Sequence, residues 1–182
     1  NAVASGPQEM ETEQRIAVEG QIMGWADRLV AASPLEKAQM AWLYGADPAK
    51  IRVIPAGVDT QRFRPIPPDT AKKQIGLPEE RKLILFVGRI EPLKGIETLF
   101  RAIAILAKET PCFCDNIGVS IIGGEGESTD ATRSAEEERL RNLREELGLE
   151  KLVTFLGSKD QDTLPYYYSA AYVVTVQSYY ES

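Results

Sequence analysis

The feature that most constrains this chain is the regular alternation of strand and helix patterns from residue 81 onward. Residues 82–88, KLILFVG, include five consecutive apolar residues, which is typical of a strand buried on both faces. Further strands are predicted at IGVSIIGG, LVTFLG and YVVTV, with helices between them. Strands that alternate with helices pair in parallel, so the pattern predicts a doubly wound α/β sheet over residues 81–182.

The helices of this half show different apolar faces. After the first strand, apolar residues recur at a spacing of three or four and predict an amphipathic helix; they are Ile96, Leu99, Phe100, Ile103 and Leu106. A second helix is predicted over residues 131–147, with leucines on one side and a stop at Gly148. Its three consecutive glutamates, Glu136 to Glu138, are interpreted as a solvated face.

A shorter β-α-β pattern precedes this half, in residues 1–57. Residues 8–27 are interpreted as an amphipathic helix, and LVAAS and IRVIPAG as short strands. The sequence Ser33-Pro34-Leu35-Glu36 is a capping box with proline at the first helical position, and the helix that it opens is expected to end near Gly45. Residues 58–80 carry four prolines and many charges. They are interpreted as an interdomain linker with one helical turn around Ala71 to Ile75.

Composition excludes several classes of function. The net charge of -6 argues against broad binding to nucleic acid or to an anionic membrane, and no apolar run is long enough to cross a bilayer. The chain has no histidine, which removes Ser-His-Asp and Cys-His catalysis and histidine-based metal sites. Cys112 and Cys114 are interpreted as reduced thiols, in keeping with a cytoplasmic protein.

Ligands of doubly wound sheets bind beyond the carboxyl ends of the strands, which directs attention to the loop VGRIEPLKG. Arg89 follows the first buried strand, and Lys94 precedes Gly95 at the start of a helix. A diphosphate is bound by dispersed positive charge and by helix N-terminal N–H groups, and Gly88 and Gly95 let the backbone approach a ligand closely. On spacing alone, a phosphate clamp and two ordinary surface charges are equally good interpretations.

Three segments in one order resemble a known family. VIPAGVDTQRFRP, LFVGRIEPLKGIETLFRAI and FLGSKDQDTLPYYYSAAYVVTVQSYYES together resemble the large retaining glycosyltransferase family with the GT-B fold, which includes sucrose-phosphate synthases and the mycothiol glycosyltransferase. The resemblance implies that residues 1–57 are the last part of an N-terminal, acceptor-side Rossmann-like domain. Residues 58–80 are then the linker, and residues 81–182 a donor-binding Rossmann-like domain truncated at its C-terminal end.

The resemblance also implies roles for particular residues. Arg89 and Lys94 match the basic pair that binds the donor diphosphate and stabilises the departing charge, with Gly88 beside them. Glu181 matches the first of two family glutamates, which contacts the donor sugar. The loop that contacts the nucleotide base is matched by Gly157, Ser158 and Lys159. Asp160 is expected to cap the next helix or to contact the nucleoside.

The implied reaction transfers a sugar, with retention, from a nucleotide diphosphate sugar to a hydroxyl acceptor. UDP-glucose is the favoured donor and a sugar phosphate the favoured acceptor. No cofactor and no metal is expected. Tyr172 stands where the family usually has aspartate, and Gln177 where proline is common. The second glutamate is absent, so the 182 residues alone are expected to bind nucleotide weakly and not to catalyse.

Two alternatives remain open at this stage. The chain could be a non-catalytic nucleotide-sugar-binding or interaction module that uses the GT-B shape alone. It could also belong to a nucleotide-sugar epimerase of the same shape, although the Arg89–Lys94 pair and the SYYES segment fit the transferase pattern better.

Overall fold

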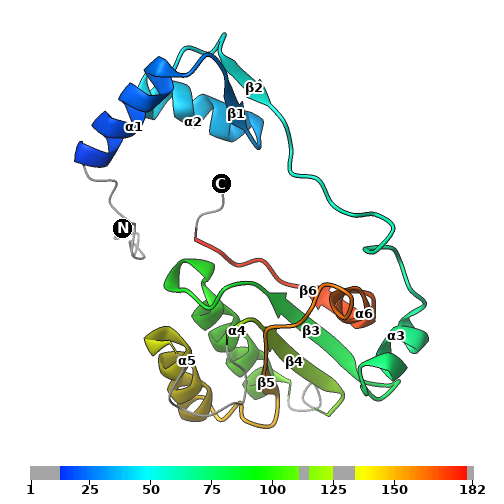
Figure 1. Cartoon of the computed structure of the whole chain (residues 1–182). Coiled ribbons are helices and arrows are strands. Elements are labelled where there is room, and N and C mark those ends of the chain that lie inside the picture. The colour runs from blue at the N-terminus through cyan, green and yellow to red at the C-terminus, as the bar shows by residue number, and fades with distance from the viewer. Residues whose placement is uncertain (1–12, 111–114, 125–133, 180–182) are drawn as a thin grey trace. The chain divides into compact units, whose positions relative to one another are not determined.

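The computed structural model describes residues 13–110, 115–124 and 134–179, and these form two compact units. Unit 1 comprises the described residues up to Asp59, and unit 2 runs from Thr60 to Tyr179. Each unit is an α/β structure with a parallel sheet, as predicted (Figure 1).

Unit 1 is the predicted β-α-β arrangement preceded by a helix. Its elements are α1 (Glu13–Trp25), β1 (Leu29–Ala31), α2 (Pro34–Tyr44) and β2 (Ile51–Val53). The two strands are parallel, with Leu29 opposite Ile51. The Ser33 side chain accepts a hydrogen bond from the Glu36 N–H over 3.1 Å, and Gly45 ends α2 in a left-handed conformation. The Ser33 cap and the helix end are therefore confirmed, whereas the Glu36 carboxylate accepts from the Ala32 N–H and not from the Ser33 N–H of a capping box.

The core of unit 1 is small. Its buried hydrophobic residues are Ala31, Ala46 and Ile51. Of the apolar residues of α1 that predicted a packed face, Val18, Ile22 and Trp25 are exposed, with Trp25 at 79%, and Ile16 is half-buried. Helix α1 is therefore present, but it packs against the core of unit 1 through Met23 and not through Val18, Ile22 or Trp25.

Unit 2 contains a four-stranded parallel sheet in the order β5-β4-β3-β6. The strands are β3 (Lys82–Val87), β4 (Ile117–Ile122), β5 (Val153–Gly157) and β6 (Ala171–Val174). The chain builds outward from β3 through β4 to β5 and then returns to place β6 on the other side of β3. This reversal is the doubly wound topology that the sequence predicted.

Helices cover both faces of this sheet (Figure 1). On one face, α4 (Ile96–Glu109) and α5 (Ala135–Glu146) enclose a cluster in which the rings of Phe100 and Phe155 meet edge-to-face at 6.0 Å. On the other face, α3 (Pro68–Gln74) and α6 (Leu164–Ala170) enclose a second cluster around Leu83 and Leu85. Leu106, expected on the buried face of α4, is 39% exposed and is not among the residues of the packed cluster.

The stretch interpreted as a linker contains a packed helix. Helix α3 spans Pro68–Gln74, with Ala71 fully buried against unit 2. Upstream, the ring of Phe63 lies 6.3 Å from that of Tyr168, and the Ile66 N–H donates to the Ser169 hydroxyl over 3.2 Å. Proline at the first helical positions starts a helix, so these prolines do not interrupt one. Residues from about 62 onward therefore pack as part of unit 2.

The interpretation of Glu136 to Glu138 as one solvated face is wrong for Glu137. Glu137 is 1% exposed and pairs with the buried Arg141, whose Nη2 lies 2.9 Å from Oε1 of Glu137. Glu138 is exposed, as expected. Three identical residues in a row were interpreted alike, although each occupies a different side of the helix. Only Glu137 faces the sheet.

Candidate functional site

The candidate site lies at the carboxyl edge of the sheet in unit 2. The strand order reverses between β3 and β6, and ligands of doubly wound sheets bind in the crevice at this switch point. The loop after β3 carries Arg89 and Lys94, and the segment 175–179 follows β6. Both candidate phosphate-binding residues therefore stand at the position that the topology favours.

The two basic side chains differ in their surroundings. Arg89 is 79% exposed, and its Nη1 lies 2.7 Å from Oε1 of Glu91. Lys94 is half-buried at the end of the 3-10 turn η1 (Pro92–Lys94), and Gly95 follows as the N-cap of α4 with φ of 63°. The loop therefore brings both side chains to the start of a 14-residue helix.

The segment after β6 packs directly on this loop. The Thr175 N–H donates to the Leu85 carbonyl over 2.8 Å, and the Tyr179 N–H donates to the Leu93 carbonyl over 2.9 Å. A methyl group at Gly95 would overlap the carbonyl oxygen of Gln177, so only glycine fits there. Glu181, the expected donor-sugar residue, lies outside the described residues, two positions after Tyr179.

Glycine backbone joins the other strand ends. The Gly88 N–H donates to the Ile122 carbonyl, and the Gly123 N–H donates to the Gly157 carbonyl, both over 3.0 Å. The N–H and the hydroxyl of Ser158 both donate to the Gly124 carbonyl, also over 3.0 Å. The residues expected to touch the donor, Gly88, Gly157 and Ser158, therefore belong to one hydrogen-bonded edge.

Lys159 and Asp160 follow Ser158 on this edge. Lys159 is half-buried. Asp160 is exposed and accepts hydrogen bonds from the Thr163 N–H (2.7 Å) and hydroxyl (2.9 Å). The Thr163 hydroxyl is the main cause that lowers the pKa of Asp160 below its ordinary value. Asp160 therefore caps the turn that leads into α6, which is the capping role considered for it.

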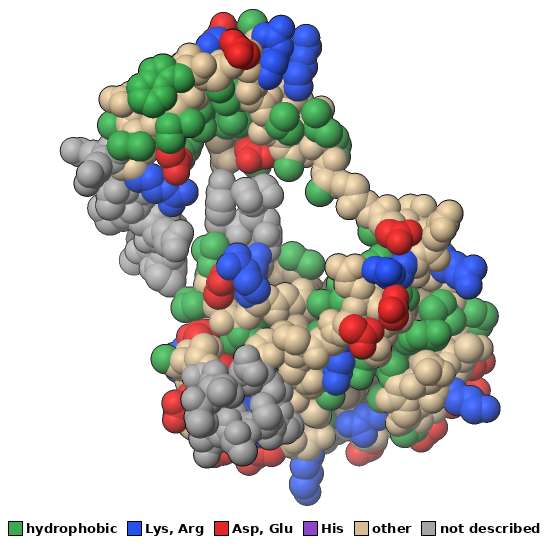
Figure 2. Space-filling model, in the orientation of Figure 1, with side chains coloured by type: hydrophobic (Ala, Val, Ile, Leu, Met, Phe, Trp, Pro, Cys, Tyr) green, Lys and Arg blue, Asp and Glu red, His purple; other side chains and the backbone are tan. Residues whose placement is uncertain are grey.

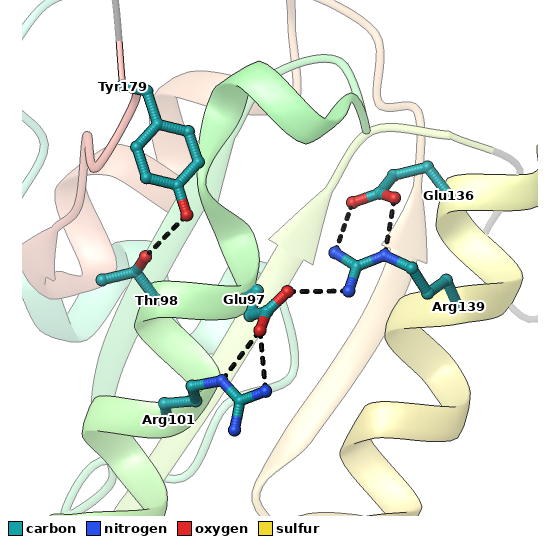
Figure 3. A network of polar contacts seen from close by, with 6 residues as sticks. All are labelled: Glu97, Thr98, Arg101, Glu136, Arg139 and Tyr179. Atoms are coloured by element: carbon teal, nitrogen blue, oxygen red, sulfur yellow. Dashed lines mark hydrogen bonds and ion pairs between the residues drawn. The ribbon is translucent and has the colours of Figure 1, made fainter. Parts of the chain in front are cut away.

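A polar network flanks the start of α4 (Figure 3). Glu97 accepts from Arg101 on its own helix and from Arg139 on α5, and Arg139 also pairs with Glu136. These arginines lower the pKa of Glu97, with Arg139 the larger cause. On the other side of the helix start, the Thr98 and Tyr179 hydroxyls are 3.4 Å apart. The network thus ties α4 to α5 and to the segment after β6.

Three residues at this edge of the sheet were not predicted from the sequence to belong to the site. Glu91 pairs with Arg89, and Glu137 lies beneath Gly124. The amide atoms Nε2 and Oε1 of Gln177 are buried without a hydrogen-bond partner among the described residues. Gln177 was noted only as a departure from the family pattern. The spacing of three residues between Glu137 and Leu140 could have indicated that Glu137 faces the core. The contacts of Gln177 depend on long-range packing and could not be predicted.

The described part of the chain holds neither a metal-ligand cluster nor a membrane-spanning helix. Within it, no group of three or more histidine, cysteine, aspartate or glutamate side chains is placed to hold a metal ion. None of its helices is both long and apolar enough to cross a membrane.

Comparison with known families decides the class of protein. A family model described as "Glycosyl transferases group 1" matches residues 68–182, and one described as "Glycosyltransferase Family 4" matches residues 4–62. The chain belongs to the group 1 glycosyltransferases. The family resemblance read from the three sequence segments is therefore confirmed.

Individual relatives of this glycosyltransferase chain agree. It is 37% identical over its whole length to D-inositol 3-phosphate glycosyltransferase 2 of Catenulispora acidiphila, and spans 42% of that protein. It is 40% identical, over 94% of its length, to the D-inositol 3-phosphate glycosyltransferase of Acidothermus cellulolyticus, and spans 38% of it. The chain thus spans about two fifths of the length of these relatives.

Solved structures support the GT-B fold. The sucrose-phosphate synthase of Thermosynechococcus elongatus superimposes with a TM-score of 0.81 at 37% identity, covering 98% of this chain and 41% of the synthase. Anabaena HepE in complex with UDP-glucose superimposes with a TM-score of 0.71 at 21% identity, covering 91% of this chain and 42% of HepE. The GT-B-type fold predicted from the sequence is confirmed.

Proposed function

We propose that this chain supplies the donor-binding part of a retaining glycosyltransferase that moves glucose from UDP-glucose to a hydroxyl group of a phosphorylated acceptor. The observation that carries the proposal is the position of Arg89 and Lys94, on the β3–α4 loop at the switch point of the sheet. Support for a phosphorylated acceptor comes from the relatives, whose names specify D-inositol 3-phosphate and sucrose phosphate.

In the proposed reaction the bond between the anomeric carbon and the diphosphate oxygen breaks, and its electron pair leaves with the diphosphate. The acceptor oxygen bonds to the same face of the sugar, and the acceptor proton passes to the leaving phosphate. Arg89 and Lys94 stabilise the charge that develops on the diphosphate. Turning Arg89 toward the donor breaks its exposed pair with Glu91, which costs no more than about 1 kcal/mol.

The remaining proposed contacts come from the same edge and from Glu181, which lies outside the described residues. Gly88 lets the backbone approach the diphosphate, and the loop of Gly157, Ser158 and Lys159 holds the nucleotide base. Glu181 orients the donor sugar. The proposed site uses neither cofactor nor metal, and the proposed compartment is the cytoplasm.

Calorimetric titration of the complete protein that carries this chain tests the donor site. UDP-glucose is expected to bind more tightly than GDP-glucose or ADP-glucose. Arg89→Ala and Lys94→Ala should each weaken UDP-glucose binding about 10- to 100-fold, the range expected for a charged hydrogen bond. The matched control is Lys82→Ala, which removes one positive charge at the opposite end of β3. If both site variants keep the wild-type affinity, the diphosphate assignment is wrong.

Product analysis tests the reaction. With UDP-glucose and a phosphorylated acceptor, proton NMR of the first product is expected to show the α-anomer, and the dephosphorylated acceptor is expected to react much more slowly. A β-anomer as first product contradicts retention. Binding of UDP-glucose without turnover on any phosphorylated or free hydroxyl acceptor favours the non-catalytic module. The 182 residues alone are expected to bind the donor weakly and to give no product in the same assay.

A further inference from the structure

A buried ion pair lies in α5, outside the residues assigned to donor binding. Glu137 is 1% exposed and Arg141 is 7% exposed, and Nη2 of Arg141 lies 2.9 Å from Oε1 of Glu137. The guanidinium of Arg141 also lies over the ring of Phe155, with its central carbon 4.4 Å from the ring centroid. A buried carboxylate is costly even when it is paired. Stability alone therefore gives a weak reason for a glutamate here, and its other contacts matter.

The second oxygen of this carboxylate faces Gly124, at the end of β4. A methyl group at Gly124 would overlap Oε2 of Glu137 and would stand 2.7 Å from Cδ1 of Ile90. Gly124 also has φ of 63°, a conformation that glycine adopts readily. The carboxylate and Ile90 therefore confine the α-carbon of Gly124.

The contacts continue from Gly124 to the loop of Arg89. A methyl group at the neighbouring Gly123 would overlap the carbonyl oxygen of Gly88, and an added Cβ there would stand 3.9 Å from the backbone nitrogen of Arg89. Ile90, the residue after Arg89, is 8% exposed and belongs to the same core cluster as Phe155. On one side of Arg89 the Gly88 carbonyl thus lies against Gly123, and on the other side the Ile90 side chain lies against Gly124, which in turn lies against Glu137.

We propose that Glu137 is a positioning residue for the donor. Its carboxylate, held by Arg141, fixes Gly123 and Gly124, and so sets the backbone from which Arg89 reaches the diphosphate of a nucleotide sugar. This inference rests on the proposed function. It assigns Glu137 no contact with the donor, because the glycine backbone lies between them.

The test is the affinity of the complete protein for UDP-glucose, measured by calorimetry. Glu137→Gln keeps the size of the side chain and removes its charge. It is expected to weaken binding about tenfold, as the loss of a supporting contact behind a binding group does. Glu138→Gln is the matched control, since it makes the same change one residue along the same helix at an exposed position, and it should leave the affinity within about twofold.

A double-mutant cycle with Arg89→Ala separates positioning from general damage to the fold. If Glu137 acts through Arg89, Glu137→Gln should weaken binding less than about twofold in the Arg89→Ala background. An equal loss in both backgrounds, or a loss below about twofold in the wild-type background, overturns the proposal. If Arg89→Ala and Lys94→Ala both leave UDP-glucose binding unchanged, the proposed function fails. If Arg89→Ala weakens binding and Glu137→Gln does not, only the positioning role fails.

Loss of folding is excluded by recording thermal unfolding of each variant and titrating well below its transition. If Glu137→Gln does not fold, Glu137→Asp replaces it in the cycle. Aspartate keeps the charge but withdraws the carboxylate from Gly124 by one methylene group. It should show the same loss, and the same dependence on Arg89. Wild-type affinity for Glu137→Asp would then refute the proposal.

Discussion

Units 1 and 2 are built from the same β-α-β pattern but bury very different amounts of apolar surface. The described residues of unit 1 contribute only Ala31, Ala46 and Ile51 as buried hydrophobic residues, whereas unit 2 has an apolar cluster on each face of its sheet. In unit 1, Trp25 and Trp42 are 79% and 82% exposed, and hydrophobic side chains lie on its surface (Figure 2). The alternation of strand and helix therefore fixes a topology without fixing how much core it encloses.

Separating the units should give the largest effect. Residues 60–182 are expected to unfold in one cooperative thermal transition, because their sheet is covered on both faces. Residues 1–59 are expected to show no sigmoidal transition, because so short a chain with so small a core gains too little from burial. Far-UV circular dichroism during heating makes the comparison. A cooperative transition of residues 1–59 alone would show that the exposed side chains do not limit its stability.

A core substitution in unit 2 should rank next. Phe155→Ala removes a fully buried ring that packs against Phe100 and under Arg141, and should lower the free energy of unfolding of unit 2 by about 3–5 kcal/mol. Ile51→Ala, which removes a buried side chain of unit 1, is the control and should leave that transition unchanged. Urea unfolding monitors both. A loss below about 1 kcal/mol for Phe155→Ala would contradict the packing of the cluster between the sheet and helices α4 and α5.

The Glu97 network should have a smaller, pH-dependent effect. Its arginine partners lower the pKa of Glu97 in the folded protein below the ordinary value of 4.5. The network's contribution is therefore complete above 4.5 and is lost as the pH falls through the folded pKa. Glu97→Gln should reduce the free energy of unfolding by about 1 kcal/mol at neutral pH, and the difference from wild type should shrink in acid. Glu146→Gln, at an exposed position of α5, is the control. If the difference in unfolding free energy between wild type and Glu97→Gln grew on acidification, the pKa of Glu97 would be raised in the folded protein and not lowered.

The smallest effect is expected in unit 1. Trp42 is 82% exposed, so Trp42→Ser should change the free energy of unfolding by no more than about 0.5 kcal/mol. Urea unfolding of the whole chain, followed by circular dichroism, measures it. A large loss of stability would mean that Trp42 packs in solution, and would narrow the contrast between the units.

The strands and the strand-ending loops could be predicted because their signals are local. Strand β3 is buried on both faces, so its five apolar residues stand together in the sequence. Arg89 stands two residues after the end of that strand, so its position at the carboxyl edge could be predicted from its sequence position alone. Glu137 also had a local signal, because it stands three residues before Leu140 and four before Arg141, on the same side of the helix. It was nevertheless interpreted as solvated, because its two neighbours are also glutamates.

Other features depend on packing between distant segments. The prolines before α3 indicated a linker, and only the contact with α6 shows that they start a helix that packs in unit 2. The apolar residues of α1 have helical spacing, yet burial depends on a partner surface, which unit 1 does not provide for Trp25. The fit of Gly95 against Gln177 joins positions 82 residues apart (177 − 95), which no local pattern encodes.

That fit sets a rule for protein engineering. Because the loop of residues 88–95 and the segment 175–179 touch through backbone atoms, neither can be grafted from another enzyme without the other. A chimera that exchanges only one of them would bring a foreign main chain into a contact that has no room for even one added methyl group. The two segments form a single cassette for recombination, although more than half of unit 2 separates them in the gene.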